Sequence, residues 1–334
     1  MMREAELYRP IQGGAVECLL CRHHCIIKDG RSGICGVREN RGGKLYSIFY
    51  GRPVAVAVDP IEKKPLFHFL PGSRSFSIAT PGCNFQCSFC QNWDISQYKG
   101  GEVPTYELSP REAAEKARKL GCASISYTYS EPTVFFEYAR DTAIEAERLG
   151  LKNVFVTNGY MTREMIDTFH PHLHAANIDL KSFNKDVYRR IMKGDKDGVL
   201  DSIRYMKEKG IWIEITTLIV PQMNDSEEEM REIARFIAGV GRDIPWHISR
   251  FHPAYKMTEK PPTPLETLIG AYRVGKEEGL KFIYIGNVGT DSYEATYCPK
   301  CRSRLISRSG FDVLYNRLLG NRCPECGEEI EGLF

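Results

Sequence analysis

Apolar runs and helix-like stretches alternate regularly through the middle of the chain. Short runs rich in β-branched and aromatic residues are typical of buried strands, and apolar residues three to four positions apart are typical of helices. The runs predict strands at residues 75–80, 123–129, 153–157, 175–180, 211–220, 246–251 and 281–285. The intervening stretches predict helices that begin near residues 109, 134, 163, 199, 226 and 263.

Six strand–helix units and one further strand form a βα repeat, which predicts a parallel sheet with right-handed crossovers. Ser109-Pro110-Arg111-Glu112 and the pair Ser226 and Glu229 predict capping boxes at two of the helix starts. Six or seven strands are fewer than the eight of a closed TIM barrel. We therefore expect an α/β fold with a partial, open (β/α)6 barrel, with an open flat sheet as the alternative.

The sequence divides into three parts. Residues 1–72 form a Cys-rich N-terminal segment with a predicted hairpin, whose strands lie at 45–49 and 54–58. Residues 73–290 form the barrel, and residues 291–334 form a C-terminal lobe. The charged stretch 59–65 is expected to be a rigid connector.

The composition narrows the class of protein without naming it. The 334 residues are 42% hydrophobic and 26% charged, as in a soluble globular protein, with a net charge of +2. Such a weak charge argues against a nucleic-acid or membrane-surface protein. No run of eighteen apolar residues and no signal-peptide pattern is found, so we expect a cytoplasmic protein without a membrane partner.

Eleven of the twelve cysteines fall into three clusters, which favours metal sites over disulfides. The remaining one, Cys122, is expected to be a small buried residue. The C-terminal cluster consists of two C-x2-C knuckles separated by 21 residues, a pattern typical of a zinc ribbon. Its four expected zinc ligands are Cys298, Cys301, Cys323 and Cys326.

The N-terminal cluster reads C-x2-C-x3-C-x9-C in a Gly-rich segment. Four cysteines at this density favour a closed structural zinc site, and His23 or His24 could replace one thiolate. A second iron–sulfur cluster is the competing interpretation. The residues concerned are Cys18, Cys21, Cys25 and Cys35.

The central cluster, Cys83-x3-Cys87-x2-Cys90, has three thiols and no fourth nearby. Iron–sulfur clusters are normally held by four cysteines. Three thiolates therefore leave one iron of a [4Fe–4S] cluster open to a small molecule. A zinc site with a distant fourth ligand, or buried structural thiols, are the alternatives.

Polar residues follow four of the predicted strands at their carboxyl ends, where ligands bind in parallel α/β folds. They are Glu131, Asn158, the pair Asp179 and Lys181, and His252. Each is weak evidence alone, because a strand-end Asn-Gly is usually a turn and a lone His is usually structural. Their recurrence on one rim indicates a binding site.

The Cys loop with Gln91-Asn92-Trp93-Asp94, the Asp179-Leu180-Lys181 segment and His252 resemble the pyruvate formate-lyase activating enzymes. The Cys-rich N-terminus, residues 64–72, residues 127–132 and residues 298–301 resemble more specifically the radical SAM enzyme of the AmmeMemoRadiSam system. This second resemblance covers nearly the whole chain. That family is named for its association with Memo-like and AMMECR-like proteins, which are therefore expected partners.

The resemblance implies that Cys83, Cys87 and Cys90 hold the [4Fe–4S] cluster and that S-adenosylmethionine (SAM) chelates the open iron. It also implies the cofactor-binding residues. Glu131 is expected near the SAM amino group, Asn158, Asp179 and Lys181 around the ribose and carboxylate, His252 beside the nucleoside and Phe89 beside the adenine.

The sequence departs from the activating enzymes at two places. Val156 replaces an Asp that helps to hold a monovalent cation beside SAM, which puts that cation in doubt here. Tyr129-Ser130 replaces two glycines before Glu131-Pro132, so the carboxylate is kept but the flexible backbone is not.

The expected activity is reductive cleavage of SAM to methionine and a 5′-deoxyadenosyl radical, with a ferredoxin or flavodoxin as electron donor. The substrate is either a protein glycine, as for an activating enzyme, or another molecule. Two other classes stay open: a scaffold protein with zinc in all three Cys clusters, and a simple electron carrier that does not bind SAM.

Overall fold

A single eight-stranded sheet forms the centre of the computed structural model, which describes residues 2–289 and 293–334. Seven strands are parallel and follow one another across the sheet in chain order, and β7 is antiparallel at one edge. The strands are β7 (Ala55–Pro60), β8 (Arg74–Ala79), β9 (Ser124–Tyr127), β10 (Lys152–Thr157), β11 (Ala175–Asp179), β12 (Trp212–Ile219), β13 (Trp246–Arg250) and β14 (Ile283–Gly286).

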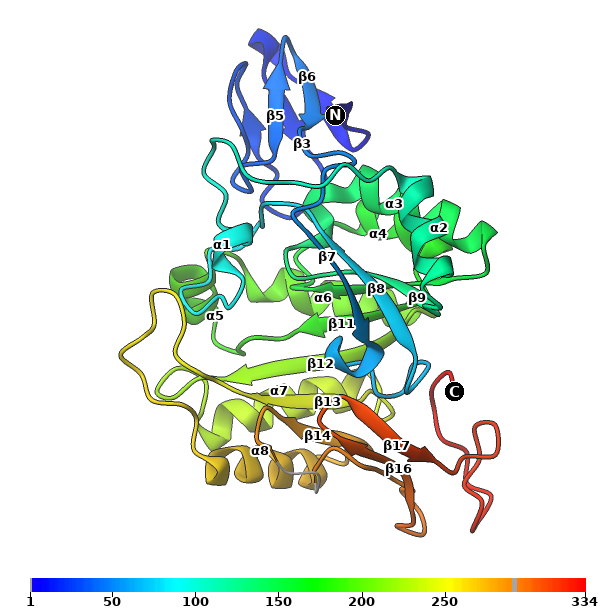
Figure 1. The fold of residues 1–334 in the computed structure, drawn as a ribbon. Coiled ribbons are helices and arrows are strands. Elements are labelled where there is room, and N and C mark those ends of the chain that lie inside the picture. Colours follow the sequence, from blue (N-terminus) through cyan, green and yellow to red (C-terminus); the bar gives the residue numbers. More distant parts are fainter. Residues whose placement is uncertain (1, 290–292) are drawn as a thin grey trace.

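Helices cover the outer face of this sheet, which curves into a partial barrel (Figure 1). They are α2 (Pro110–Lys119), α3 (Phe136–Arg148), α4 (Arg163–Phe169), α6 (Lys196–Glu208), α7 (Glu227–Val240) and α8 (Leu265–Glu277). Two short helices, α1 (Trp93–Ser96) and α5 (Lys185–Val187), lie instead in the loops at the carboxyl ends of the strands. The sheet does not close, because β7 and β14 stand at its two ends. The predicted partial α/β barrel is therefore confirmed.

The predicted helix caps are confirmed at one helix and half confirmed at another. At α2, Ser109 and Glu112 form the complete reciprocal box. At α7, the Ser226 hydroxyl accepts from the Glu229 N–H, but the Glu229 carboxylate instead accepts from Ser182 and from the Phe183 N–H. The prediction failed there because a buried loop offered Glu229 stronger partners than the exposed backbone did.

Residues 61–70 fill the inside of the barrel, which the predicted connector did not anticipate. Residues 61–63 form a 3-10 helix, and Ile61, Leu66 and Phe69 pack in one buried cluster with Val154 of β10 and Ala175 of β11. Burying three large apolar side chains contributes several kcal/mol, at about 1.5–3 kcal/mol each. The stretch is thus a core element of the barrel.

Two small sheets precede the barrel, and the predicted hairpin was wrong. One sheet has the order β1-β6-β5 and the other β2-β3-β4. The sixth strand pairs with β5 and β1, whereas β7 pairs with β8 of the barrel, so the two expected hairpin strands part at Gly51. The strands are β1 (Arg3–Glu4), β2 (Tyr8–Pro10), β3 (Val16–Cys18), β4 (Ile26–Ile27), β5 (Arg38–Arg41) and β6 (Lys44–Ser47).

A third small sheet, with the order β15-β16-β17, forms the C-terminal ribbon. Its strands are β15 (Thr296–Tyr297), β16 (Arg304–Ser309) and β17 (Asp312–Asn316). The N-terminal sheets and this ribbon lie at opposite ends of the molecule (Figure 1). The expected boundary between residues 290 and 291 lies outside the described residues.

The ribbon shares its core with the barrel. Its apolar cluster contains Phe67, Phe282 and Tyr284 of the barrel beside Leu305 and Ile306. A lobe whose core is half supplied by its neighbour cannot be expected to fold as a separate unit.

A buried arginine also joins the two parts. Arg308 of β16 is fully buried, donates to the carbonyl of Phe67 at 2.8 Å and lies 4.2 Å from the ring of Phe67. The same guanidinium donates to the Glu294 carbonyl and to Thr296. These bonds satisfy a charge that would otherwise be costly to bury.

Within the described part of the chain, every helix is too short or too polar to cross a lipid bilayer.

Candidate active site

The Cys loop begins where β8 ends, at the carboxyl ends of the parallel strands. Within it, the Phe85 N–H donates to the Cys83 sulfur at 3.3 Å, and the Cys90 sulfur lies 3.2 Å from the Ser96 hydroxyl. A [4Fe–4S] cluster would place each of the three thiolates of this loop on a different iron.

The Cys loop thiols also suit an iron–sulfur cluster chemically. Burial raises the pKa of Cys83 well above its usual value, and it raises the pKa of Cys87 to about 12. Metal binding must displace those protons, so Cys83 and Cys87 are sulfur ligands that only a strong Lewis acid will deprotonate. These donors fit the [4Fe–4S] cluster that the sequence predicts.

Glu131 and Asn158 lie on one side of the Cys loop. The Asn158 side-chain amide donates to the Asn84 side chain at 2.7 Å and points to the Cys83 sulfur at 3.7 Å, and its backbone N–H donates to Glu131 at 2.9 Å. The Glu131 carboxylate also accepts from Thr133 and Thr157. Burial raises the pKa of Glu131, although these hydrogen bonds oppose the rise.

Asp179 and Lys181 lie on the other side, beside Cys87. The Lys181 ammonium is 2.8 Å from the Asp179 carboxylate and 6.0 Å from the ring centre of Phe89. Burial opposes the charged form of Lys181, but Asp179 and Cys87 outweigh it and raise the lysine pKa. This ammonium therefore stays charged at every physiological pH.

The structure thus brings together five of the six residues predicted to bind the cofactor, in two groups around the Cys loop. The sixth, His252, is exposed on the loop after β13. That loop touches the Cys loop at a different residue, because the Lys256 N–H donates to the Ser88 carbonyl at 3.0 Å. His252 is therefore on the expected rim but is not part of either group.

A buried polar cluster on the inner face of the barrel was missed by the sequence analysis. The Asp59 carboxylate accepts from Lys64 and Ser77, both at 2.7 Å, and from the Tyr129 hydroxyl. Burial lowers the pKa of Lys64 to about 8, and the bond to Asp59 opposes that shift. Tyr129 precedes Glu131 by two residues and its carbonyl accepts from Asn92 of the Cys loop at 2.9 Å, so this cluster borders the predicted SAM site.

The sequence held a weak signal for this cluster. Asp59 and Lys64 were visible as charged residues, but a charged stretch rich in proline is usually a solvated connector. Only the pairing of β7 with β8 turns the carboxylate into the barrel.

The C-terminal cysteines form a compact metal site. The sulfur atoms of Cys298, Cys301, Cys323 and Cys326 all lie within 4.8 Å of one another, with two pairs at 3.6 Å. Tetrahedral zinc with Zn–S bonds of about 2.3 Å needs sulfur atoms about 3.8 Å apart. The four thiols therefore fit a single tetrahedral ion such as zinc.

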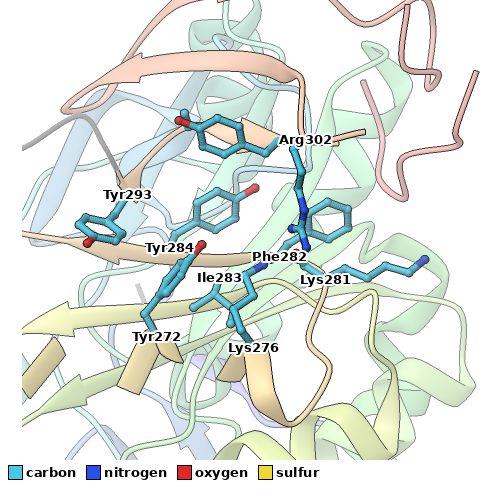
Figure 2. A pocket seen from close by; sticks show the side chains of 10 residues that line it. Tyr272, Lys276, Lys281, Phe282, Ile283, Tyr284, Tyr293 and Arg302 are labelled. Carbon is cyan, nitrogen blue, oxygen red and sulfur yellow. Dashed lines mark hydrogen bonds between the residues drawn. The ribbon is translucent and has the colours of Figure 1, made fainter. Parts of the chain in front are cut away.

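A separate pocket lies where the ribbon meets β14 (Figure 2). Tyr272, Tyr284 and Tyr293 line it together with Lys276 and Arg302. Because these residues lie around the start of β14, the pocket is at the opposite rim from the Cys loop. It is not the predicted SAM site.

Comparison with known proteins agrees with this site. Residues 77–237, which contain the Cys loop and both groups of polar residues, match the family model of the radical SAM superfamily. An uncharacterized protein of Methanocaldococcus jannaschii is 45% identical over 333 residues, which is 99% of both chains. The pyruvate formate-lyase-activating enzyme of Clostridium pasteurianum is 24% identical over 51% of this chain and 71% of that enzyme.

Solved structures show the same fold. The crystal structure of Streptococcus suis SuiB bound to S-adenosylmethionine matches 72% of this chain and 56% of SuiB, with a TM-score of 0.52 and 16% identity. The chain belongs to the radical SAM superfamily. Within it, the chain is similar to the pyruvate formate-lyase activating enzymes.

Proposed function

We propose that this protein is an enzyme that reductively cleaves SAM at a [4Fe–4S] cluster on Cys83, Cys87 and Cys90. The observation that supports this best is the pair of polar groups on either side of the Cys loop. One side offers a buried carboxylate and an amide, and the other offers a charged lysine held by an aspartate. SAM is a zwitterion that needs both kinds of partner. When bound, the cluster and SAM supply a 5′-deoxyadenosyl radical.

The residues of the chain would then divide the work of holding SAM. Glu131 would accept from the ammonium, while Lys181 would bind the carboxylate and Asp179 would keep Lys181 in place. Asn158 would fix the edge of the Cys loop through Asn84. Phe89 and His252 would border the adenosine moiety, His252 from a more exposed position.

The substrate space would lie against Asp59, Lys64 and Tyr129 on the inner face of the barrel. These side chains already hydrogen-bond to one another, so a bound substrate would contact polar groups whose positions are fixed. Such preorganisation favours a polar reacting group over an apolar one.

We further propose a family, a substrate class and partners for this enzyme. The whole-chain resemblance supports the radical SAM enzyme of the AmmeMemoRadiSam system, with Memo-like and AMMECR-like proteins as partners. A protein glycine, as for an activating enzyme, is one candidate substrate, and a small molecule is the other. A ferredoxin or flavodoxin would supply the electron, and zinc would fill the C-terminal site.

The test is anaerobic incubation of the reconstituted protein with SAM and dithionite, followed by chromatography for 5′-deoxyadenosine. The wild type should release it slowly without its true substrate. Lys181→Ala should keep the brown cluster but bind SAM roughly 10–100-fold more weakly, because it removes a charge-assisted hydrogen bond. Lys185→Ala is the matched control, since Lys185 forms an exposed pair with Asp197 on a nearby helix.

Three results would contradict the proposal. A fully loaded cluster that yields neither 5′-deoxyadenosine nor an adenosylated product would exclude SAM cleavage. Equal SAM affinity in Lys181→Ala and Lys185→Ala would exclude the assigned SAM site. A colourless protein that contains only zinc would favour the scaffold instead.

A further inference from the structure

The pocket where the ribbon meets β14 is lined by basic side chains and, among the described residues, by no acidic one. It has a volume of about 170 Å³, and its basic residues are Lys276, Lys281 and Arg302. Figure 2 shows Lys276 extending from α8 and Arg302 extending from the ribbon toward one another, whereas Lys281 points away from them. Positive charge from two separate parts of the fold therefore gathers at this pocket.

Two of these three basic groups lack an opposite charge. Lys281 forms an ion pair with Glu331. In residues 2–289 and 293–334, neither Lys276 nor Arg302 forms an ion pair with a carboxylate. The Lys276 ammonium donates instead to the carbonyl of Lys281 at 2.8 Å. The two cations can therefore take up an anion without first breaking a salt bridge.

The carboxylates that follow Lys276 on α8 are held by another helix. Glu277 and Glu278 lie 2.9 and 3.0 Å from the guanidinium of Arg231 on α7. Burial and the nearby charge of Arg302 lower the pKa of Lys276 to about 8. A bound anion would oppose this shift, because an opposite charge favours the charged form of an amine.

Tyrosine rings form the wall beside these cations. Tyr272 and Tyr293 pack edge to face with ring centres 5.4 Å apart, and the Lys276 ammonium lies 5.5 Å from the ring centre of Tyr272. The hydroxyls of both tyrosines have no hydrogen-bond partner within the part of the chain that the structure describes. Free hydroxyl donors beside two cations suit an anion with several oxygen atoms, and the rings limit the screening of its charge by water.

Arg302 occupies a backbone position that favours glycine. In the two C-x2-C knuckles of the ribbon, Arg302 follows Cys301 and Gly327 follows Cys326. Both residues have a left-handed backbone, with a φ of +65° for Arg302 and +71° for Gly327. Glycine adopts this conformation freely, whereas a residue with a Cβ is strained there. The strain indicates that the side chain of Arg302 has a role that glycine could not fill.

From the two unpaired cations, the free hydroxyls and the strained arginine, we infer that this pocket binds a phosphate group. The planar guanidinium of Arg302 matches two phosphate oxygens at once, and the ammonium of Lys276 adds a point charge. The pocket is smaller than the roughly 300–1,000 Å³ that drug-sized ligands occupy, so it encloses the phosphate and leaves any attached group outside. A bound phosphate would bridge the ribbon and α8, and this inference does not depend on the proposed SAM chemistry.

The test measures phosphate binding by anaerobic calorimetry in a chloride buffer of fixed ionic strength. It uses the full-length protein loaded with zinc and with its iron–sulfur cluster. Inorganic phosphate should bind to the wild type and raise its melting temperature, because a ligand stabilises the folded form that binds it. Phenyl phosphate is the second probe. Tighter binding of phenyl phosphate would identify a phosphomonoester as the ligand, and tighter binding of inorganic phosphate would identify free phosphate.

Arg302→Gly is the decisive variant, because it removes the cation and relieves the backbone strain at the same position. It should weaken phosphate binding roughly 10–100-fold, while its melting temperature without phosphate should be no lower than that of the wild type. Lys276→Gln should weaken binding by a similar factor without changing the knuckle. Arg317→Ala is the matched control, since Arg317 pairs with the exposed Glu325 elsewhere in the ribbon and should not affect phosphate binding.

The outcomes separate this inference from the proposed function. Equal phosphate affinity in the wild type, Arg302→Gly and Lys276→Gln would overturn the inference and indicate an adventitious ion only. Phosphate that binds to the wild type no better than chloride would overturn it as well. If Arg302→Gly fails to fold, Lys276→Gln still decides, because it leaves the four C-terminal cysteines and their loops unchanged. Failure of the wild type to form 5′-deoxyadenosine would overturn the proposed function and leave this inference standing, since the pocket lies at the rim opposite the Cys loop.

Discussion

The two ends of this chain use similar cysteine patterns in different surroundings. Both contain a C-x2-C pair, and within the residues described the four C-terminal sulfur atoms gather within 4.8 Å of one another, as one tetrahedral ion requires. The C-terminal site is sealed onto the amino-end rim of the barrel, and the N-terminal site lies against the Cys loop at the other rim. A similar sequence spacing therefore stands in two different surroundings, one in a ribbon packed on the barrel and one beside the Cys loop.

The strongest challenge to this comparison is a pair of single substitutions with opposite effects on the metals. Cys87→Ala should abolish 5′-deoxyadenosine formation and remove about four irons, while the zinc stays. Cys323→Ala should remove the zinc but leave the irons, because its site shares no ligand with them. Metal analysis and chromatography on the same samples check both expectations. Loss of iron in Cys323→Ala would show that the two ends are coupled more tightly than their separation suggests.

The attachment of the ribbon should depend on Arg308. Arg308→Ala leaves the Phe67 and Glu294 carbonyls without their donor and the buried Glu62 carboxylate, 3.5 Å away, without its cation. It should lower the free energy of unfolding by roughly 3–5 kcal/mol, as removal of one partner from a buried charged pair does. Arg317→Ala removes an exposed ion pair with Glu325 from the same ribbon and should cost at most about 1 kcal/mol. Anaerobic thermal unfolding compares them. Similar melting temperatures for the two variants would contradict the role of Arg308.

The same junction should weaken in acid because of His68. This buried ring bonds to the Glu331 carbonyl and the Tyr284 hydroxyl, and burial lowers its pKa to about 4. Because its pKa is lowered, the His68 ring is neutral in the folded protein. The stabilisation that the neutral ring gives is therefore present in full above pH 6.5 and is lost as the pH falls toward 4. The full loss should be about 3 kcal/mol, at 1.36 kcal/mol per pKa unit.

Melting temperatures at pH 7.5 and pH 5 measure this effect. His68→Gln should flatten the dependence between these two values, and His24→Gln, at an exposed position, should not. Parallel pH profiles in the wild type and His68→Gln would exclude His68 as the source.

The N-terminal contact can be probed at Gly82, whose φ of +98° already disfavours other residues. The methyl group of Gly82→Ala would also clash with the Cys35 carbonyl and with Val37. Gly121 is the control, because its φ is +68° and an added methyl group there would meet no atom within 4 Å. The left-handed conformation alone costs about 1–2 kcal/mol, and overpacking adds about 1–3 kcal/mol. Gly82→Ala should therefore unfold at the lower temperature, and equal values would remove the evidence for a tight contact.

The sequence was sufficient for the parts of this molecule that local rules govern. Strand and helix order followed from hydrophobic periodicity, and Ser109 and Glu112 closed their box because the two residues lie three positions apart at an unburied helix start. The Cys loop and the acidic, amide and lysine residues after the strands were found because parallel strands bring their carboxyl ends to one rim.

What the sequence could not reveal depends on contacts between distant residues. Asp59 was predicted to be part of a connector, yet it accepts from Tyr129, which is seventy positions away. Glu214 is a single acidic residue in an apolar strand, yet it accepts from His247 and from the backbone of Phe67 and His68. Side-chain pairs of this kind depend on the register of strand pairing and on which segment fills the barrel. The local hydrophobic periodicity of a sequence predicts neither of these.

The segment inside the barrel also sets an order of events during synthesis. Residues 61–70 are made early, but Leu70 donates to the Leu333 carbonyl and the Leu333 N–H donates to the carbonyl of His68. These hydrogen bonds cannot form until residue 333 has left the ribosome, so the barrel floor is sealed after every strand has been translated. Contacts over such a separation are slow to form and leave apolar surface uncovered in the meantime. A shortened chain that ends before the ribbon would carry every residue of the proposed radical site and still lack its floor.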